Sequence, residues 1–271
     1  MIQKLIFLFL LTALSLYAYN DYDMDGVDDK QDKCPNTLLS ELVNSDGCPI
    51  KNLQSYHNFD IIYGFDFYQT SYTSLENSDT LSQSLQLDYY YKNFSIQLSS
   101  SYYNTSTTSF NDSGVNDSFA GMYYKIETNS NLNIRLGVGA IIPTYDSQLN
   151  NNNTDYVGSI NLSYLYNNIN IFGTYSHTIV NDSGIVEDGV LYQNSNAYSI
   201  GAGFYPANKF YISGSYSRSD SIYLGVDTIE TASVYGLYSI DKHWFSTLNY
   251  AYGVSDSASD NFASLRIGYY F

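Results

Sequence analysis

Charged residues are scarce in this sequence. Asp, Glu, Lys and Arg make up 14% of its 271 residues, and only 11 residues are Lys or Arg. A soluble β-domain of this size normally carries about a quarter charged residues, so an ordinary water-facing surface is not expected. The formal net charge is −16 and no segment concentrates basic residues, which argues against nucleic acid as a partner.

Histidine occurs only three times, at His57, His177 and His243, without a metal-ligand or catalytic neighbour at a characteristic spacing. The grouping of Ser176, His177 and Asn181 resembles the Ser, His and Asn set of some outer-membrane phospholipases. Consecutive residues of a strand point to opposite faces, however, so Ser176 and His177 do not suit one catalytic triad. We therefore expect no enzymatic activity.

Long apolar runs are absent beyond the amino terminus. The one run, Leu5 to Leu14, follows Lys4 and precedes the small residue Ala18, which predicts a cleaved export signal over residues 1–18. This run is too short to span a bilayer comfortably, and no later run is long enough for a transmembrane helix. A membrane form of this chain would need a closed β-barrel, because an open sheet leaves backbone groups unpaired in lipid.

Aromatic residues, by contrast, are abundant, with 31 Tyr and 14 Phe. Tyr suits a membrane interface, because its ring tolerates the acyl boundary and its hydroxyl tolerates headgroups. Apolar and polar residues alternate with period two from residue 56 onward, which predicts about twelve antiparallel strands. The expected strands are 57–70, 81–91, 94–104, 115–127, 132–144, 154–166, 169–180, 195–205, 210–220, 229–240, 245–254 and 260–271.

The connections between these strands alternate in length. The short ones are 92–93, 128–131, 167–168, 206–209 and 241–244; the longer ones, rich in Asn, Ser and Asp, lie near 71–80, 105–114, 145–153, 181–194, 221–228 and 255–259. Short turns on one side, long loops on the other and an even strand count are typical of outer-membrane barrels. We therefore predict an all-β fold, an antiparallel transmembrane β-barrel of about twelve strands over residues 56–271.

The last strand, residues 260–271, presents one apolar face and one small or charged face, and it ends on Phe271 beside Tyr269 and Tyr270. An ordinary half-buried edge strand is the soluble alternative. The ending resembles the terminal strand of Gram-negative outer-membrane barrels, OmpA-like or porin-like, whose final aromatic residue is read by the assembly machinery. The resemblance implies an outer-membrane location, with lipid, lipopolysaccharide and the barrel assembly machinery as partners.

One phase of the alternation carries large apolar side chains, and the other carries charges. The charges should face the lumen and pair there, because an ion facing lipid is costly. The predicted lumen residues are Asp60, Asp66, Asp88, Lys125, Glu127, Arg135 and Arg266. Closure would place the first and last strands side by side, so we predict ion pairs of Arg266 with Asp60 and Asp66, and similar pairing among Lys125, Glu127 and Arg135. Arg218 falls in the lipid phase, where it would snorkel to the headgroups or contact a lipopolysaccharide phosphate.

Residues 19–50 differ sharply from the rest, because they are acidic and show no β alternation. Asp21, Asp23 and Asp25 occupy every second position before Gly26, a spacing that lets an extended loop wrap a cation. The carbonyl of Val27 and the carboxylates of Asp29 and Asp32 fall where later ligands of such a loop belong. Hard oxygen ligands favour Ca²⁺. A solvated acidic linker is the alternative.

The stretch from Asp21 to Pro49 closely resembles a thrombospondin type-3 repeat, and includes Cys34-Pro-Asn-Thr37 and Gly47-Cys-Pro49. The resemblance implies calcium bound by the matching acids and a disulfide between Cys34 and Cys48. These are the only cysteines, and an exported chain with two cysteines in one small motif should have them joined. Such a bridge and Ca²⁺ would replace the core that so short a segment lacks.

Two functions remain open from the sequence. The first is a channel or transporter for small solutes, which suits a barrel of this strand count with charges inside. The segment from Leu136 to Thr144 resembles a glycine- and proline-containing strand end of outer-membrane transporters linked to aromatic catabolism. The second is a structural or adhesive anchor, whose lumen is filled by side chains and whose long loops are the active part.

Overall fold

The computed structural model describes residues 21, 23, 27–37, 43–49, 56–71, 77–109, 111–128, 131–145, 153–181, 186–187 and 190–271. The predicted export signal, residues 1–18, and the predicted calcium ligand Asp25 lie outside this part. The chain divides into two compact units, residues 1–54 and 55–271.

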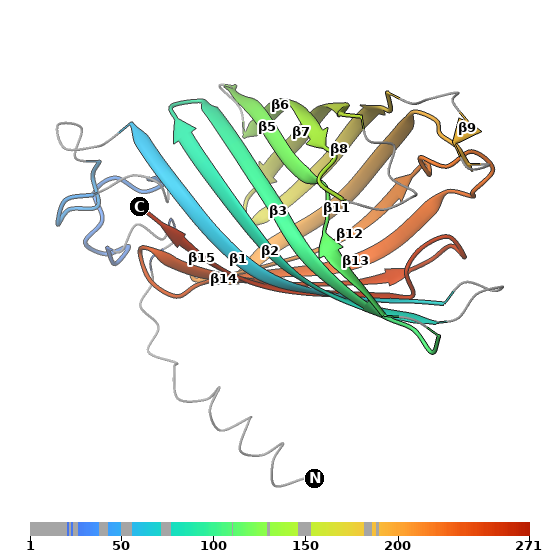
Figure 1. The fold of residues 1–271 in the computed structure, drawn as a ribbon. Helices are drawn as coiled ribbons and strands as arrows, with labels where there is room; N and C mark the ends of the chain where they lie inside the picture. The colour runs from blue at the N-terminus through green and yellow to red at the C-terminus, as the bar shows by residue number, and fades with distance from the viewer. Residues whose placement is uncertain are drawn as a thin grey trace, which may run out of the picture. The chain divides into compact units, whose positions relative to one another are not determined.

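The second unit is a β-barrel, and Figure 1 shows its long tilted strands side by side. The strands are β1 (His57–Thr70), β2 (Ser78–Tyr91), β3 (Phe94–Ser106), β4 (Asn111–Val115), β5 (Ser118–Glu127), β6 (Leu132–Ile142), β7 (Asp155–Tyr166), β8 (Ile169–Ile179), β9 (Val186–Glu187), β10 (Val190–Leu191), β11 (Ser195–Ala207), β12 (Phe210–Ser219), β13 (Ile229–Ser239), β14 (Trp244–Gly253) and β15 (Asn261–Tyr270). Each long strand pairs antiparallel with its neighbours in sequence.

The predicted strands are confirmed, with two differences. The predicted loop 105–114 contains most of an additional strand, β4, and the fourth predicted strand, 115–127, is continuous only from Ser118, where β5 begins. β4 pairs with the long-loop part of β3, and β5 pairs with its short-turn part. The predicted loop 181–194 contains a small hairpin, β9 with β10. If β4 and β5 are counted together as one interrupted strand, the barrel has the twelve strands that the alternation predicted.

Pairing between β1 and β15 closes the barrel. Ten residue pairs, from Asp60 with Tyr270 to Gln69 with Asn261, align the two strands. The amide of Phe59 donates to the carbonyl of Phe271 (2.8 Å), the amide of Phe271 donates back (3.0 Å), and the two rings stack with centroids 5.4 Å apart. The terminal aromatic residue therefore completes the sheet rather than extending beyond it.

A partly buried ion pair lies on the inner side of this seam. Arg266 Nη2 lies 3.4 Å from Asp66 Oδ1, and the Asp66 side chain is only 5% exposed. Ser264, directly opposite Asp66, donates its hydroxyl to the same carboxylate at 2.5 Å and accepts from Arg266 Nε at 3.3 Å. The predicted pairing of Arg266 with Asp66 is confirmed.

Short turns join the strands at the end where both β1 begins and β15 ends. Lys92 and Asn167 take positive φ angles of 52° and 54°, as two-residue hairpin turns require. In the turn 241–244, the Asp241 carboxylate accepts the amides of His243 and Trp244, each at 2.8 Å. These two N–H groups, that of Trp244 first, lower the pKa of Asp241 because they bind its charged form.

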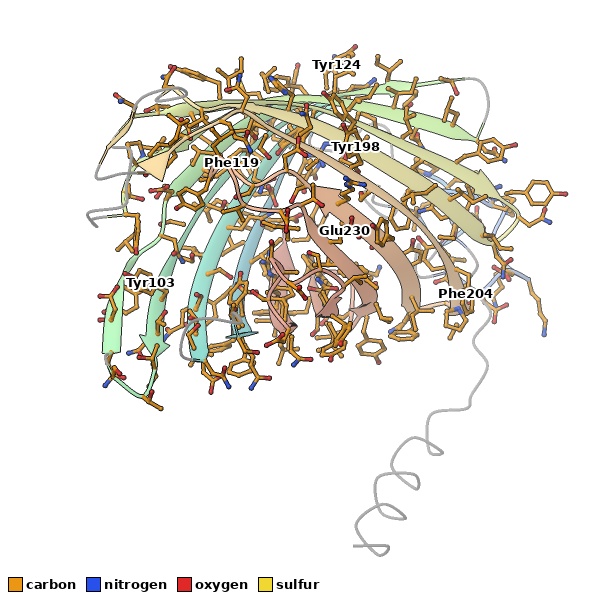
Figure 2. The ribbon with its side chains drawn as sticks, turned by 90° about the vertical axis from the view of Figure 1, so that its right-hand side faces the viewer. Tyr103, Phe119, Tyr124, Tyr198, Phe204 and Glu230 are labelled. Carbon is orange, nitrogen blue, oxygen red and sulfur yellow. A yellow bond between two sulfur atoms is a disulfide. The ribbon has the colours of Figure 1, made fainter. Side chains whose placement is uncertain are left out.

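The two faces of the wall differ as the sequence predicted. The outer face exposes large apolar side chains; Ile200 is 64% exposed and Leu248 59%. Figure 2 shows Tyr124 on the outer surface and Phe119 on the inner one. An apolar face of this extent is not stable in water and requires a lipid or detergent covering.

Aromatic rings on the inner face lie over glycines of the wall. The Phe119 ring covers Gly121 on its own strand and Gly139 on β6, so a Cβ added at either would lie 2.7 Å or 2.6 Å from the ring. Phe172, Tyr211 and Phe245 are arranged in the same way. The equivalent glycines are Gly201, Gly203 and Gly268. Glycine thus lets each ring lie flat on the wall, which leaves the centre of the barrel clear of it.

The first unit is small and cross-linked. Cys34 and Cys48 form a disulfide, with Cα atoms 4.9 Å apart, which confirms the predicted bridge. The Thr37 hydroxyl contacts the carbonyls of Cys34 and Gly47 at 2.8 and 3.0 Å. A loop of this length closed by a disulfide gains roughly 3 kcal/mol in the chain-entropy model.

Within the described ranges, no helix is long and apolar enough to cross a membrane.

The glycine beneath Phe119 should be intolerant of a side chain. Gly139→Val should lower the free energy of unfolding by about 1–3 kcal/mol, because the branched side chain displaces the ring. Gly158→Val is the matched control, because nothing lies within 4 Å of its added Cβ. Thermal unfolding followed by circular dichroism measures both. Equal effects of the two substitutions would contradict the packing described above.

The seam ion pair should contribute measurably to stability. Asp66→Asn should cost about 2 kcal/mol, because Arg266 and Ser264 lose a charged hydrogen-bond partner. Glu127→Gln removes a carboxylate from a solvent-exposed pair and should cost less than about 1 kcal/mol. Denaturant titration of the refolding barrel compares them, and an Asp66 variant as stable as the Glu127 variant would refute the role of the pair.

Candidate functional site: the lumen of the barrel

The lumen is the candidate site, because the alternation of the strands brings the predicted charges to the inner face. Asp60 and Asp66 lie on β1, Asp88 on β2, Lys125 and Glu127 on β5, Arg135 on β6 and Arg266 on β15. Adjacent residues of these strands face outward and are apolar, as at Ile61 and Leu87. The burial patterns thus agree with the predicted lumen phase.

Asp60 does not pair with Arg266, and this part of the prediction is wrong. The register places Asp60 opposite Tyr270 and Asp88. Arg266 lies opposite Gly64, four residues further along β1. Asp60 Oδ2 instead accepts the Tyr90 hydroxyl at 2.9 Å. Asp60 Oδ1 is buried and has no hydrogen-bond partner among the described residues. Two carboxylates therefore face each other across β1 and β2.

The Asp88 carboxylate accepts Gln86 Nε2 at 2.7 Å and is buried. Asp60 and Asp88 together form an acidic patch on the inner wall near the short-turn end. Its carboxylates are held by a phenol and an amide, which are neutral donors.

The three charges on β5 and β6 pair only in part. Lys125 Nζ lies 3.1 Å from Glu127 Oε1 on the same strand. Arg135 is directly opposite Lys125, and its guanidinium stacks on the Tyr123 ring at 3.8 Å instead of joining the pair. Its Nη2 also donates to the Ser95 hydroxyl at 3.4 Å. A cation over a Tyr face is a stabilising arrangement that needs no carboxylate.

Three of the charged lumen side chains remain in contact with solvent, whereas Asp66 and Asp88 are buried. Lys125 is 40% exposed, Glu127 54% and Arg266 35%. Among the described residues, Val180 is the one large side chain that is fully buried. An interior packed with side chains would instead bury a large set of residues at close to protein density. Lys125, Glu127 and Arg266 are therefore accessible to solvent on the inner wall.

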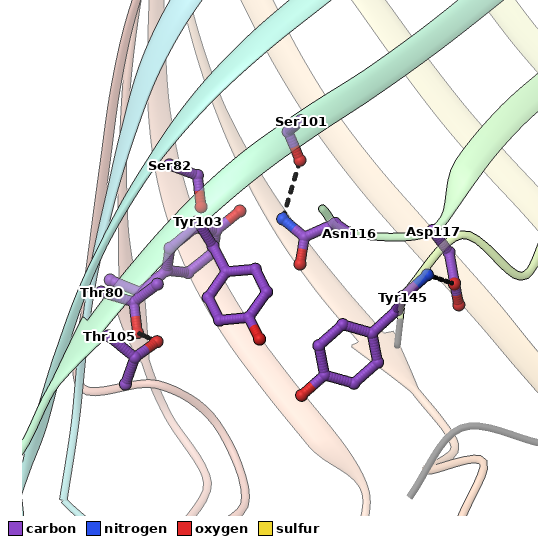
Figure 3. Close-up of a pocket in the computed structure, with 9 residues that line it drawn as sticks. Thr80, Ser82, Ser101, Tyr103, Thr105, Asn116, Asp117 and Tyr145 are labelled. Atoms are coloured by element: carbon purple, nitrogen blue, oxygen red, sulfur yellow. Dashed lines mark hydrogen bonds between the residues drawn. The ribbon is translucent and has the colours of Figure 1, made fainter. Parts of the chain in front are cut away.

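A cavity of about 590 Å³ opens at the long-loop end of the wall (Figure 3). Its lining comes from β1, β2, β3, the 116–117 break and the segment after β6. The lining residues are Tyr68, Thr80, Ser82, Ser101, Tyr103, Thr105, Asn116, Asp117 and Tyr145. No motif in the sequence marks these residues as a site, because they come together only through the pairing of the strands.

Charge is distributed unevenly between the two ends of the barrel. The long-loop segments 71–77, 105–118, 143–154, 180–194, 220–228 and 254–260 contain acidic residues and neither Lys nor Arg. Lys92, Lys209 and Lys242 all lie in short turns. The long-loop mouth is consequently acidic, whereas the lysines of the turns lie at the opposite end together with acidic residues such as Asp60 and Asp241.

The grouping of Ser176, His177 and Asn181 is not assembled as a triad. His177 Nδ1 pairs with Asn196 Oδ1 at 2.9 Å, and the Asn181 amide side chain donates to the Thr154 carbonyl at 2.7 Å. Ser176 and His177 occupy opposite phases of β8.

Arg218 lies in the lipid phase near the long loops, as predicted, and its Nε is 3.7 Å from Glu230 Oε1 on the adjacent strand (Figure 2 labels Glu230). The guanidinium thus has a partner of its own on the outer face.

The predicted calcium ligands belong to the first unit. Asp21 is buried, and Asp23 Oδ1 is a buried acceptor with no hydrogen-bond partner in the described part of the chain. The other oxygen of Asp23 accepts the Thr37 amide at 2.6 Å, and Asp32 accepts the Cys34 amide at 2.8 Å. The described residues contain no group of three or more Asp, Glu, His or Cys that could hold a metal. The unpartnered, buried oxygen of Asp23 nevertheless suits a hard cation. Calcium binding by Val27, Asp29 and the other expected ligands stays a prediction.

Comparison with known proteins identifies the architecture. No family model matches the chain, and no curated protein matches its sequence. Among solved structures, the NanC porin is similar with a TM-score of 0.50 at 14% identity, covering 78% of this chain and 97% of that one. The KdgM porin in complex with disordered oligogalacturonate gives 0.52 at 12% identity, covering 78% and 99%.

The translocator domain of the autotransporter NalP from Neisseria meningitidis gives a TM-score of 0.50 at 11% identity, covering 84% of this chain and 92% of that domain. At such low identity these similarities establish the fold alone. The chain folds as a closed, twelve-stranded antiparallel β-barrel of the kind found in outer-membrane porins.

Proposed function

We propose that this protein is an outer-membrane channel for small solutes. The observation that carries the proposal is a closed barrel whose inner wall carries solvent-exposed charges and whose outer face is apolar. Strands of 10 to 14 residues, as in β5 and β1, are long enough to span a bilayer. The porin neighbours support the same function, since two of them, NanC and KdgM, are described as porins.

The direction of insertion follows from the same features. The long loops would face the exterior and the short turns the periplasm. Because β1 begins at the short-turn end, the acidic segment that precedes it would be periplasmic after removal of residues 1–18. Lipid and lipopolysaccharide would contact the outer face, and the barrel assembly machinery would recognise the terminal strand with Phe271.

The charge distribution predicts which solutes such a channel would favour. Acidic residues at the outer mouth, without Lys or Arg, raise the local concentration of cations and repel anions. The basic residues of the lumen are partly neutralised, since Arg266 is paired with Asp66 and Lys125 with Glu127. The channel would therefore prefer cations and neutral solutes.

We also propose that the segment 19–50 binds Ca²⁺ through Asp21, Asp23, Asp25, Val27, Asp29 and Asp32. The buried, unpartnered Oδ1 of Asp23 supports this proposal. The disulfide between Cys34 and Cys48 would brace the segment that directly follows the ligand loop, which reduces the entropy lost on binding.

Planar-bilayer recording tests the channel. We expect stepwise conductance and, across a KCl gradient, a reversal potential of the sign for K⁺ preferred over Cl⁻. Stepwise conductance with preference for Cl⁻ would refute the charge argument alone. A chain that inserts but remains silent at all voltages would refute the channel and favour the anchor.

Calorimetric titration of the full chain with Ca²⁺ tests the metal site. Asp23→Asn should weaken binding by about tenfold or more, because it removes a charged ligand. Asp46→Asn is the matched control, since Asp46 lies in the same unit but pairs with Lys33 at 3.2 Å. Equal affinities of the wild type and the Asp23 variant, or no heat of binding at all, would refute the assignment.

A further inference from the structure

The cavity at the long-loop end has properties that the channel function alone does not require. It is about 590 Å³, within the range of small-molecule binding sites. Nine residues line it, and none of them is basic or aliphatic. Its lining consists of three Tyr side chains, four Ser or Thr hydroxyls, one carboxamide and one carboxylate.

Two tyrosine rings form the walls of the cavity. Tyr103 and Tyr145 lie with ring centroids 5.6 Å apart and planes inclined by 58°, and Figure 3 shows both rings projecting into the same space. The Tyr103 side chain is held from behind, because its hydroxyl donates to Asp112 Oδ2 at 2.7 Å and the residue is only 7% exposed. This ring is therefore placed before any ligand arrives.

The backbone of the second ring, Tyr145, is held by hydrogen bonds to a neighbouring segment. Asp117 Oδ1 accepts the amides of Thr144 and Tyr145 at 3.1 and 3.0 Å, which fixes the point at which the chain leaves β6. The Thr144 hydroxyl also donates to the Asn116 carbonyl at 2.7 Å. The break between β4 and β5 thus serves to dock the segment that carries Tyr145.

The floor of the cavity offers hydrogen-bonding groups with capacity to spare. Thr80 and Thr105 share one hydrogen bond of 2.8 Å, and Asn116 Nδ2 donates to the Ser101 hydroxyl at 2.8 Å. Each hydroxyl has one donor and two acceptor positions, so a single bond leaves others for a ligand. These groups suit a ligand that both donates and accepts many hydrogen bonds.

The charges restrict the ligand further. Asp117 lines the cavity, and Asp112 lies behind Tyr103, with no Lys or Arg in any of the contributing segments. An anionic ligand would meet like charge without a compensating cation. A purely apolar ligand would leave the hydroxyl floor unpaired, which is costly. A neutral, polyhydroxylated ring compound avoids both penalties. Its C–H surface can pack against a rigid Tyr ring, and its hydroxyls can hydrogen-bond to the Ser and Thr hydroxyls of the cavity.

We propose that this cavity is a binding subsite for neutral saccharides at the outer mouth of the channel. The assignment rests on the proposed channel function for its biological role, but the binding itself depends only on the cavity. A sugar that stacks on the exposed side of Tyr145 beside Tyr103 would be concentrated at the entrance and released toward the lumen.

Two measurements with purified protein in detergent or planar bilayers test the subsite. Maltotriose is the neutral probe and trigalacturonate the anionic one. In calorimetry, maltotriose should bind and trigalacturonate should bind at least about tenfold more weakly. In bilayers, maltotriose should interrupt the current reversibly.

Substitution of Tyr145 tests whether the probe binds in this cavity. Tyr145→Ala should shorten the maltotriose interruptions and weaken calorimetric binding by about tenfold, the size expected for loss of one aromatic stacking partner. Tyr156→Ala, which removes a Tyr from the outer face of β7, should leave both unchanged. Circular dichroism and unit conductance show that each variant is folded.

The outcomes separate this proposal from the channel. Binding of maltotriose in calorimetry without any conductance would overturn the channel and keep the subsite. Conductance with no maltotriose binding, tighter binding of trigalacturonate, or equal effects of Tyr145→Ala and Tyr156→Ala would overturn the subsite and keep the channel.

Discussion

The structure depends on one constraint: every strand of the sheet must be hydrogen-bonded along both edges. The pairing of β1 with β15 meets it, since these are the two strands that an open sheet would leave exposed. Once the sheet closes, each side chain must face either the interior or the outer surface. The apolar phase of the alternation can then be covered by lipid, and the polar phase can stay in water. Closure is therefore the reason that the alternation of apolar and polar residues in the sequence suits the proposed membrane location.

The bulky groups of the inner face lie flat, and its charges are held at the wall. Phe119 rests on Gly121 and Gly139, so a large ring occupies little of the lumen. Arg135 is held against Tyr123, and Arg266 against Asp66, so neither extends freely toward the axis. Such pairing compensates the cost of placing ions near a low-dielectric wall. The same arrangement leaves solvent-exposed charge for solutes to meet.

The two ends of the barrel differ in chemistry, and this difference connects the fold to the proposed selectivity. The short turns carry Lys92, Lys209 and Lys242, whereas the long-loop segments carry acids alone among their charged residues. The cavity lies on the acidic side, where Asp117 positions Tyr145 through two backbone amides. A solute arriving from the long-loop side would meet hydroxyls and tyrosine rings before it reached the paired charges of the lumen. The proposed preference for neutral and cationic solutes follows because the entrance offers hydroxyls, rings and acidic groups but no Lys or Arg.

The sequence by itself determined the strands, their faces and the disulfide. Period-two alternation and two-residue turns such as 92–93 are local properties, and two cysteines in one exported segment leave a single pairing. Only the tertiary structure decided which charges meet. Arg266 reaches Asp66 and not Asp60, because the register of β1 on β15 is set by closure of the whole sheet and not by either strand alone. The cavity likewise joins Tyr103 to Tyr145 across segments far apart in the chain. No local sequence pattern predicts such a contact, because it depends on the stagger between neighbouring strands around the whole barrel.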